Sequence, residues 1–147
     1  MKQAKLISLI LLFGLISCAP AQQRSPEEQF PLKAGQIWVL NTGDLRPLNI
    51  KFNDLEVQLD GPIKAADGEL SALIRAGTTS GRVSYKDSKL DLQVKTDPNS
   101  TSKLAFCMFP SVGSDSTSLE GSGFATDISV TSSGLAADGS CSLKLKR

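Results

Sequence analysis

Short alternation of apolar and polar residues dominates the chain from Gly35 onward. In residues 89–95, KLDLQVK, the side chains of Leu90, Leu92 and Val94 share one side, and the residues between them are charged or polar. The same alternation recurs at Leu48, Ile50 and Phe52, at Leu55, Val57 and Leu59, and at Val83 and Tyr85. Successive side chains of a strand point to opposite faces, so this period of two predicts strands with one buried and one solvated face.

Turn-forming residues separate these strands at intervals of roughly eight to twelve positions. Asp, Asn, Gly and Pro favour turns because they adopt the required φ angles or hydrogen-bond to the nearby backbone. They occur at Asn53-Asp54, Asp60-Gly61-Pro62, Asp67-Gly68, Asp87-Ser88, Asp97-Pro98-Asn99 and Asp138-Gly139. The pattern therefore predicts an all-β domain of about eight to ten short strands, either a small antiparallel barrel or a sandwich.

Two segments are less clear. Residues 69–76 alternate like a strand, but three of their apolar residues also fit one turn of a helix that would end at Gly77. We predict a strand there. Ser and Thr crowd residues 96–133, which also contain Gly121 and Gly123, and this composition predicts long loops with weakly patterned strands.

The N-terminal segment has the pattern of an export signal. Residues 1–5 carry two lysines and no acid, and residues 6–16 are apolar apart from Ser8 and Gly14. As a helix, this apolar part would be only about 16 Å long, whereas the hydrocarbon core of a bilayer is roughly 30 Å thick. The segment is therefore too short to span a membrane.

Residues 15–18, LISC, end this apolar segment and resemble the lipobox of bacterial lipoproteins. The resemblance implies that residues 1–17 are a signal peptide, cut before Cys18, and that Cys18 becomes the first residue and carries fatty acyl chains such as palmitate. Ala19, in place of Asp, implies sorting to the outer membrane if the enterobacterial rule holds. The alternative is an ordinary secretory signal, cleaved after Ala19 or Ala21.

Residues 18–34 are predicted to be the acylated cysteine and a flexible tether, because three prolines stand among mostly polar residues without an apolar period. As a coil, this segment would span roughly 20 Å, enough to hold a domain clear of the lipid headgroups. The alternative is that Phe30 and Leu32 dock on the domain. Residues 35–147 are predicted to form a single β-domain.

The charge of the mature chain is close to neutral. Cleavage before Cys18 removes Lys2 and Lys5, which leaves 14 basic residues against 15 acidic ones and a formal charge of −1. The two signs are interspersed along the chain. Nucleic-acid binding and adsorption to anionic lipid both need a basic surface, so neither is predicted.

Cys107 and Cys141 are the cysteines that remain once Cys18 is acylated. An exported chain meets an oxidising compartment, where such a pair is expected to form a disulfide. In the chain-entropy model, closing this loop stabilises the fold by roughly 4 kcal/mol. A redox-active or metal-binding pair is the alternative, but the spacing is not C-x-x-C and the chain has no histidine. We predict a disulfide that attaches the last strand to the sheet.

The absence of histidine excludes Ser-His and Cys-His nucleophile systems, His-ligated catalytic zinc and His general bases. The catalytic alternatives that remain are a carboxylate pair or a Ser-Lys dyad. The carboxylates between Asp54 and Glu69 fall mostly on strand exteriors or in Asp-Gly turns, so we interpret them as solvated surface groups. A loose calcium site at Asp60, Asp67 and Glu69 is the alternative. The sequence therefore predicts no enzyme, no cofactor and no metal site.

Gly35-Gln36-Ile37-Trp38 resembles the Gly-x-Trp that begins the first strand of lipocalins, with one residue more before the tryptophan. The resemblance implies a calycin-like barrel that binds a small apolar ligand in the periplasm or at the cell surface. The alternative is that Trp38 plugs one end of the barrel, with Ile37 and Val39 on the opposite face. The preferred hypothesis is a lipid-anchored envelope protein with a non-catalytic binding or structural role.

Residues 104–109 are apolar on both faces of the predicted strand, and this indicates where a partner would bind. In residues 141–146, the side chains of Cys141, Leu143 and Leu145 share the inner face, so the partner of Cys141 in the disulfide points inward too. This choice buries Ala105, Cys107 and Phe109. It leaves Leu104, Phe106 and Met108 on the outer face, either covered by Phe30 to Leu32 or exposed as a patch for an envelope protein or wall polymer. The sequence indicates no oligomeric state.

Overall fold

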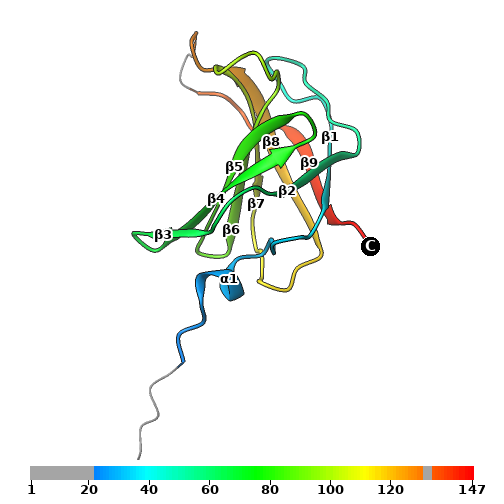
Figure 1. The fold of residues 1–147 in the computed structure, drawn as a ribbon. Helices are drawn as coiled ribbons and strands as arrows, with labels where there is room; N and C mark the ends of the chain where they lie inside the picture. The colour runs from blue at the N-terminus through cyan, green and yellow to red at the C-terminus, as the bar shows by residue number, and fades with distance from the viewer. Residues whose placement is uncertain (1–21, 131–133) are drawn as a thin grey trace, which may run out of the picture.

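The computed structural model describes residues 22–130 and 134–147. In these residues one short helix precedes an antiparallel sheet of nine strands (Figure 1). The elements are α1 (Pro26–Gln29), β1 (Trp38–Thr42), β2 (Leu55–Leu59), β3 (Lys64–Ala66), β4 (Glu69–Ala76), β5 (Thr79–Lys86), β6 (Lys89–Lys95), β7 (Lys103–Phe109), β8 (Ser118–Asp127) and β9 (Gly139–Leu145). The all-β prediction and its strand number are confirmed. In the described part of the chain, no helix is long and apolar enough to cross a membrane.

The sheet closes into a barrel because β2 pairs with β1 along one edge and with β4 along the other. From β1 the neighbours continue through β9, β8, β7, β6 and β5 to β4, so eight strands form the closed wall. β3 is the additional strand and pairs with residues 69–71 of β4, beyond the part of β4 that β2 occupies. Of the two predicted architectures, the barrel is the one that forms.

Two hairpin turns follow directly from their sequences. Asp67 and Gly68 join β3 to β4 with φ angles of 53° and 75°, and Asp87 and Ser88 join β5 to β6 with φ angles of 51° and 61°. Positive φ at both central residues is characteristic of the type I′ turn, whose twist matches that of the flanking strands. The predicted turns at these two places are confirmed.

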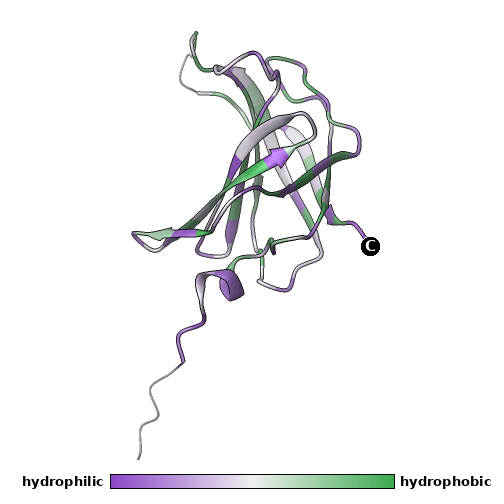
Figure 2. Ribbon diagram, in the orientation of Figure 1, coloured by the Kyte–Doolittle hydropathy of each residue, from purple (hydrophilic) through white to green (hydrophobic). Residues whose placement is uncertain are grey.

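The barrel core is built from the inward positions of the alternating strands. In β6, Leu90, Leu92 and Val94 are at most 1% exposed, as the sequence pattern predicts. Residues 69–76 form strand β4, so the helical alternative for this segment is wrong. Apolar and hydrophilic residues alternate along the strands in Figure 2, whereas α1 is mostly hydrophilic. The largest fully buried side chains are Trp38, Phe30, Phe109, Leu32, Leu40, Leu45, Ile74, Leu90, Leu92, Leu143, Val57 and Val83.

The tether predicted over residues 18–34 is wrong for its last part. Phe30 and Leu32 are fully buried and belong to the core, and burying each such side chain contributes roughly 1.5–3 kcal/mol. Ser25 begins α1 with a capping box: its Oγ accepts a hydrogen bond from the N–H of Glu28, and its own N–H donates to the Glu28 carboxylate. The folded domain therefore begins before residue 35.

β8 is one of the weakly patterned strands predicted within residues 96–133. The disulfide explains the weak pattern of this strand. Cys107 on β7 and Cys141 on β9 are bridged with a Cα–Cα distance of 5.9 Å, which confirms the predicted pair, and the bridge crosses the inner face of β8 at Gly123. A Cβ on Gly123 would lie 2.7 Å from Sγ of Cys141 and would clash with the carbonyl oxygen of Phe106. Only glycine fits at this position.

Candidate functional site

The structure describes some of the predicted site residues and not others. The predicted lipidation site, Cys18, and the predicted signal peptide, residues 1–17, lie outside the described residues. Cys107 and Cys141 are bonded to each other and at most 2% exposed, so neither is a free thiol. The predicted interaction patch lies on β7, within the described residues.

The two faces of β7 point as the sequence predicts. Ala105, Cys107 and Phe109 point into the barrel and are at most 2% exposed. Phe106 and Met108 alternate with them and lie half-buried on the outer surface. Leu104 shares their face but is only 6% exposed, opposite Thr126 of β8, which is also buried. Leu104 is therefore not an exposed member of the predicted patch.

A second aromatic side chain extends the patch from β8. Phe124 lies opposite Phe106 in the strand register, and the two rings are stacked with their centroids 4.8 Å apart and an interplanar angle of 21°. Such a pair contributes about 0.5–1.5 kcal/mol beyond the burial of its area. Sequence reasoning missed Phe124 because Gly121 and Gly123 interrupt the alternation just before it.

These side chains form one wall of an open groove of about 400 Å³ on the outside of the barrel. Its volume is within the range of roughly 300–1,000 Å³ that ligand sites occupy. Apolar groups come from β7 and β8, and polar groups come from β4, β5 and β6. The lining residues are Glu69, Arg82, Ser84, Asp91, Leu92, Gln93, Phe106, Cys107, Met108 and Phe124. We call this hollow the outer groove.

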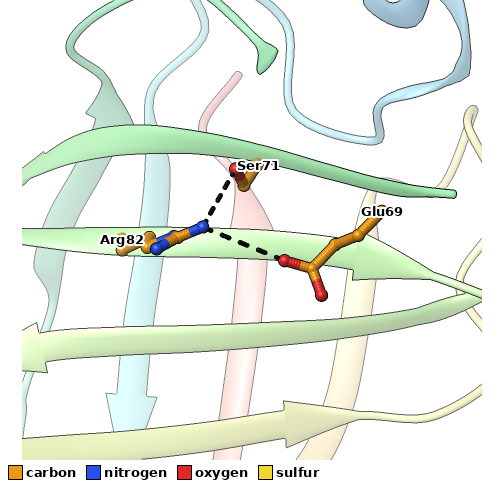
Figure 3. A network of polar contacts seen from close by, with 3 residues as sticks. All are labelled: Glu69, Ser71 and Arg82. Atoms are coloured by element: carbon orange, nitrogen blue, oxygen red, sulfur yellow. Dashed lines mark hydrogen bonds and ion pairs between the residues drawn. The ribbon is translucent and has the colours of Figure 1, made fainter. Parts of the chain in front are cut away.

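A small polar network lies at the β4 side of the outer groove (Figure 3). Nη2 of Arg82 is 3.9 Å from Oε1 of Glu69 and donates a 3.2 Å hydrogen bond to Oγ of Ser71. Both charged side chains are about half exposed, so the ion pair contributes at most about 1 kcal/mol. The network holds the guanidinium of Arg82 toward β4.

Asp91 of β6 is the second carboxylate of the outer groove. Partial burial raises its pKa above the ordinary value, and the negative charge of Glu69 raises it further, while Lys89 on the same strand lowers it. Desolvation and a like charge both disfavour the ionised form of a carboxyl group. The charged form of Asp91 is therefore held in less favourable surroundings than in water.

The segment Phe30 to Leu32 does not cover the outer groove, so the predicted internal lid is wrong. Phe30 and Leu32 belong to the core cluster inside the barrel, and the ring of Phe30 makes an edge-to-face contact with Tyr85 at 6.3 Å. The hydroxyl of Tyr85 donates to the carbonyl oxygen of Val112, 2.9 Å away. α1 lies at one end of the barrel (Figure 1), Phe30 directly follows it in the chain, and Phe106 lies on the outer surface.

Large apolar side chains of the protein itself point into the barrel interior. Trp38 is 1% exposed and its indole N–H donates to Oε1 of Gln36. This places the tryptophan among the core residues, in line with the interpretation of Trp38 as a plug. Phe52 and Tyr85 are partly buried against the same core. The outer groove, in contrast, opens between side chains on the outside of the wall.

The outer groove combines an apolar wall with charged groups. Its apolar wall and its carboxylates offer van der Waals contact and charge, whereas the one cationic group, Arg82, is engaged by Glu69 and Ser71. Among the described residues, no group of three or more His, Cys, Asp or Glu side chains is arranged to hold a metal ion, and this includes Asp60, Asp67 and Glu69.

No protein-family model matches the chain, and no curated protein or solved structure matches it.

Proposed function

We propose that the chain is a lipid-anchored lipoprotein of the bacterial cell envelope, attached to the outer membrane through Cys18, and that it binds a partner in the outer groove without catalysing a reaction. The sequence LISC at residues 15–18 supports the anchor, because it stands at the end of a short apolar segment with a basic start. The disulfide supports export, since such bonds persist in oxidising compartments.

The observation that carries the binding role is the stacked pair of Phe106 and Phe124 on the outside of the barrel. An antiparallel sheet with one solvated face normally places polar residues there. Here two aromatic rings and Met108 are half-buried on that face, beside a groove of about 400 Å³. Apolar groups gathered at one surface site, with polar groups at the rim, are typical of interaction sites.

The packed interior supports a site on the surface rather than inside the barrel. Trp38, Phe30 and Phe109 are among the largest fully buried side chains of the core. A ligand bound inside the barrel, as in a calycin, would have to displace such side chains. The outer groove needs no such rearrangement.

The change Phe106→Lys tests this function. We expect a loss of about 1–3 kcal/mol of stability, because the side chain leaves an aromatic pair and a half-buried position but not the core, and we expect the loss of chemically cross-linked partners in intact cells. The control is Phe109→Ala on the inner face of β7, which should cost about 3–5 kcal/mol. Cross-linked partners that persist in Phe106→Lys would contradict the proposal.

A further inference from the structure

The outer groove carries one negative charge that its own cation does not balance. Glu69, Arg82 and Asp91 are its charged lining residues. Arg82 is paired with Glu69 and bonded to Ser71, so these two charges offset each other at the β4 side (Figure 3). The ion pairs between described residues are Glu69–Arg82 and Glu56–Lys146. Neither pair includes Asp91.

Asp91 lies directly beside the apolar wall. It is opposite Met108 in the register of β6 and β7, and the next outward pair along these strands is Gln93 and Phe106. Residues directly opposite each other have Cβ atoms about 4.5–5.5 Å apart, and diagonal neighbours lie about 7–8 Å apart. A group that contacts the Asp91 carboxylate is therefore within reach of Met108 and of the Phe106 ring.

The surroundings of Asp91 favour a positive charge. Partial burial and Glu69 both raise the pKa of Asp91, and Lys89 on the same strand offsets this only in part. A cation in the groove would stabilise the ionised carboxylate and relieve its repulsion with Glu69.

We propose that the outer groove binds a lysine or arginine side chain of a partner protein, with the cationic head at Asp91 and the hydrocarbon stem against Met108 and Phe106. Long basic side chains combine an apolar stem with a charged tip, and the groove offers the complement of both. This inference rests on the proposed binding role of the same groove. It adds the chemistry of the partner.

Met108 provides a direct probe of this site, because the only other methionine of the chain is Met1. We would label the methionine methyl groups with ¹³C in the full chain, purified in detergent, and titrate it with a tetra-arginine peptide. We expect a saturable shift of the Met108 methyl resonance. A tetraglutamate peptide, the probe of opposite charge, should leave this resonance unchanged.

Two matched variants separate the groove from general charge attraction. Asp91→Asn should weaken tetra-arginine binding about fivefold, the factor expected for an exposed ion pair. Asp54→Asn makes the same change of charge at an exposed position before β2, which the strand order places away from β6 and β7 and which does not line the groove. It should bind tetra-arginine like the unchanged chain.

The inference is overturned if tetra-arginine at about 1 mM leaves the Met108 resonance in place, or if Asp91→Asn and Asp54→Asn bind it equally. A shift caused by N-acetylchitotetraose but not by tetra-arginine would also overturn it. That result would leave the groove as a binding site, for a wall glycan. Failure of the proposed function would differ, since the partners cross-linked in cells would then persist in Phe106→Lys.

Discussion

Gly123 is the residue of β8 over which the disulfide passes on the inside of the barrel. The bridge between β7 and β9 has to cross the intervening strand β8 on its inner face. Any side chain at this position would meet the sulfur of Cys141 and the backbone of Phe106. On the inner face of β8, the disulfide therefore fills the space that branched apolar side chains fill on other strands.

Gly123→Ala should destabilise the oxidised protein by about 1–3 kcal/mol, because the added methyl group overpacks this contact. The shift of the urea midpoint measures the loss. Gly113→Ala is the matched control, since a Cβ there would have Oγ of Ser116 at 3.7 Å as its neighbour, and it should stay within about 0.5 kcal/mol. Equal midpoints for the two variants would refute the tight crossing at β8.

At the level of elements, strands with clean alternation were predictable and the others were not. β4, β6 and β7 follow from the period of two, because burial of one face decides which side each residue takes. The glycines of β8 interrupt its alternation, so the sequence pattern did not locate this strand. α1 was hidden by its length, because a single capped turn carries no apolar period.

The lining residues of the outer groove also divide into those that the sequence predicts and those that it does not. Phe106 and Met108 were predictable because the disulfide fixes which face of β7 points inward. Arg82 and Asp91 come from β5 and β6, and they line the same groove through the strand register, which no local sequence pattern encodes. Local patterns thus predict the face of a residue, whereas its neighbours across the sheet depend on the closed fold.

The segment before β1 gives a prediction at this level. Phe30→Ala should cost about 3–5 kcal/mol, because the ring is fully buried and packs against Tyr85. Chemical denaturation measures the cost. Ile128→Ala, at a side chain that is 50% exposed, is the control and should change stability by about 0.5 kcal/mol at most. A flexible tether at residue 30 would instead give two variants of equal stability.

At the scale of the whole molecule, the packed segment shortens the connection to the proposed anchor. The chain between Cys18 and the cap of α1 at Ser25 reaches at most about 25 Å, even when fully extended. α1 lies at one end of the barrel (Figure 1), and the buried residues Phe30 and Leu32 follow it in the chain. An anchored chain would therefore hold this end toward the lipid, with the outer groove on the side of the barrel.

The proposed acylation of Cys18 predicts the effect of Cys18→Ser. This change should abolish incorporation of radiolabelled fatty acid and release the protein from the membrane fraction, because stable attachment needs two or more buried acyl chains at about 0.8 kcal/mol per methylene. Cys107→Ser, which removes a cysteine of the disulfide, should retain the label. Labelling that persists in Cys18→Ser would contradict acylation at this residue.

Site-specific photo-cross-linking in intact cells measures directly whether a partner binds at the outer groove. A photoreactive amino acid would replace Met108 in the groove and, in a second chain, Asp54, which is exposed before β2 and away from β7 in the barrel. We expect a discrete cross-linked protein from position 108 that is absent from position 54 and lost when Phe106→Lys is added. The same product from both positions, or none from position 108, would contradict the proposed binding role.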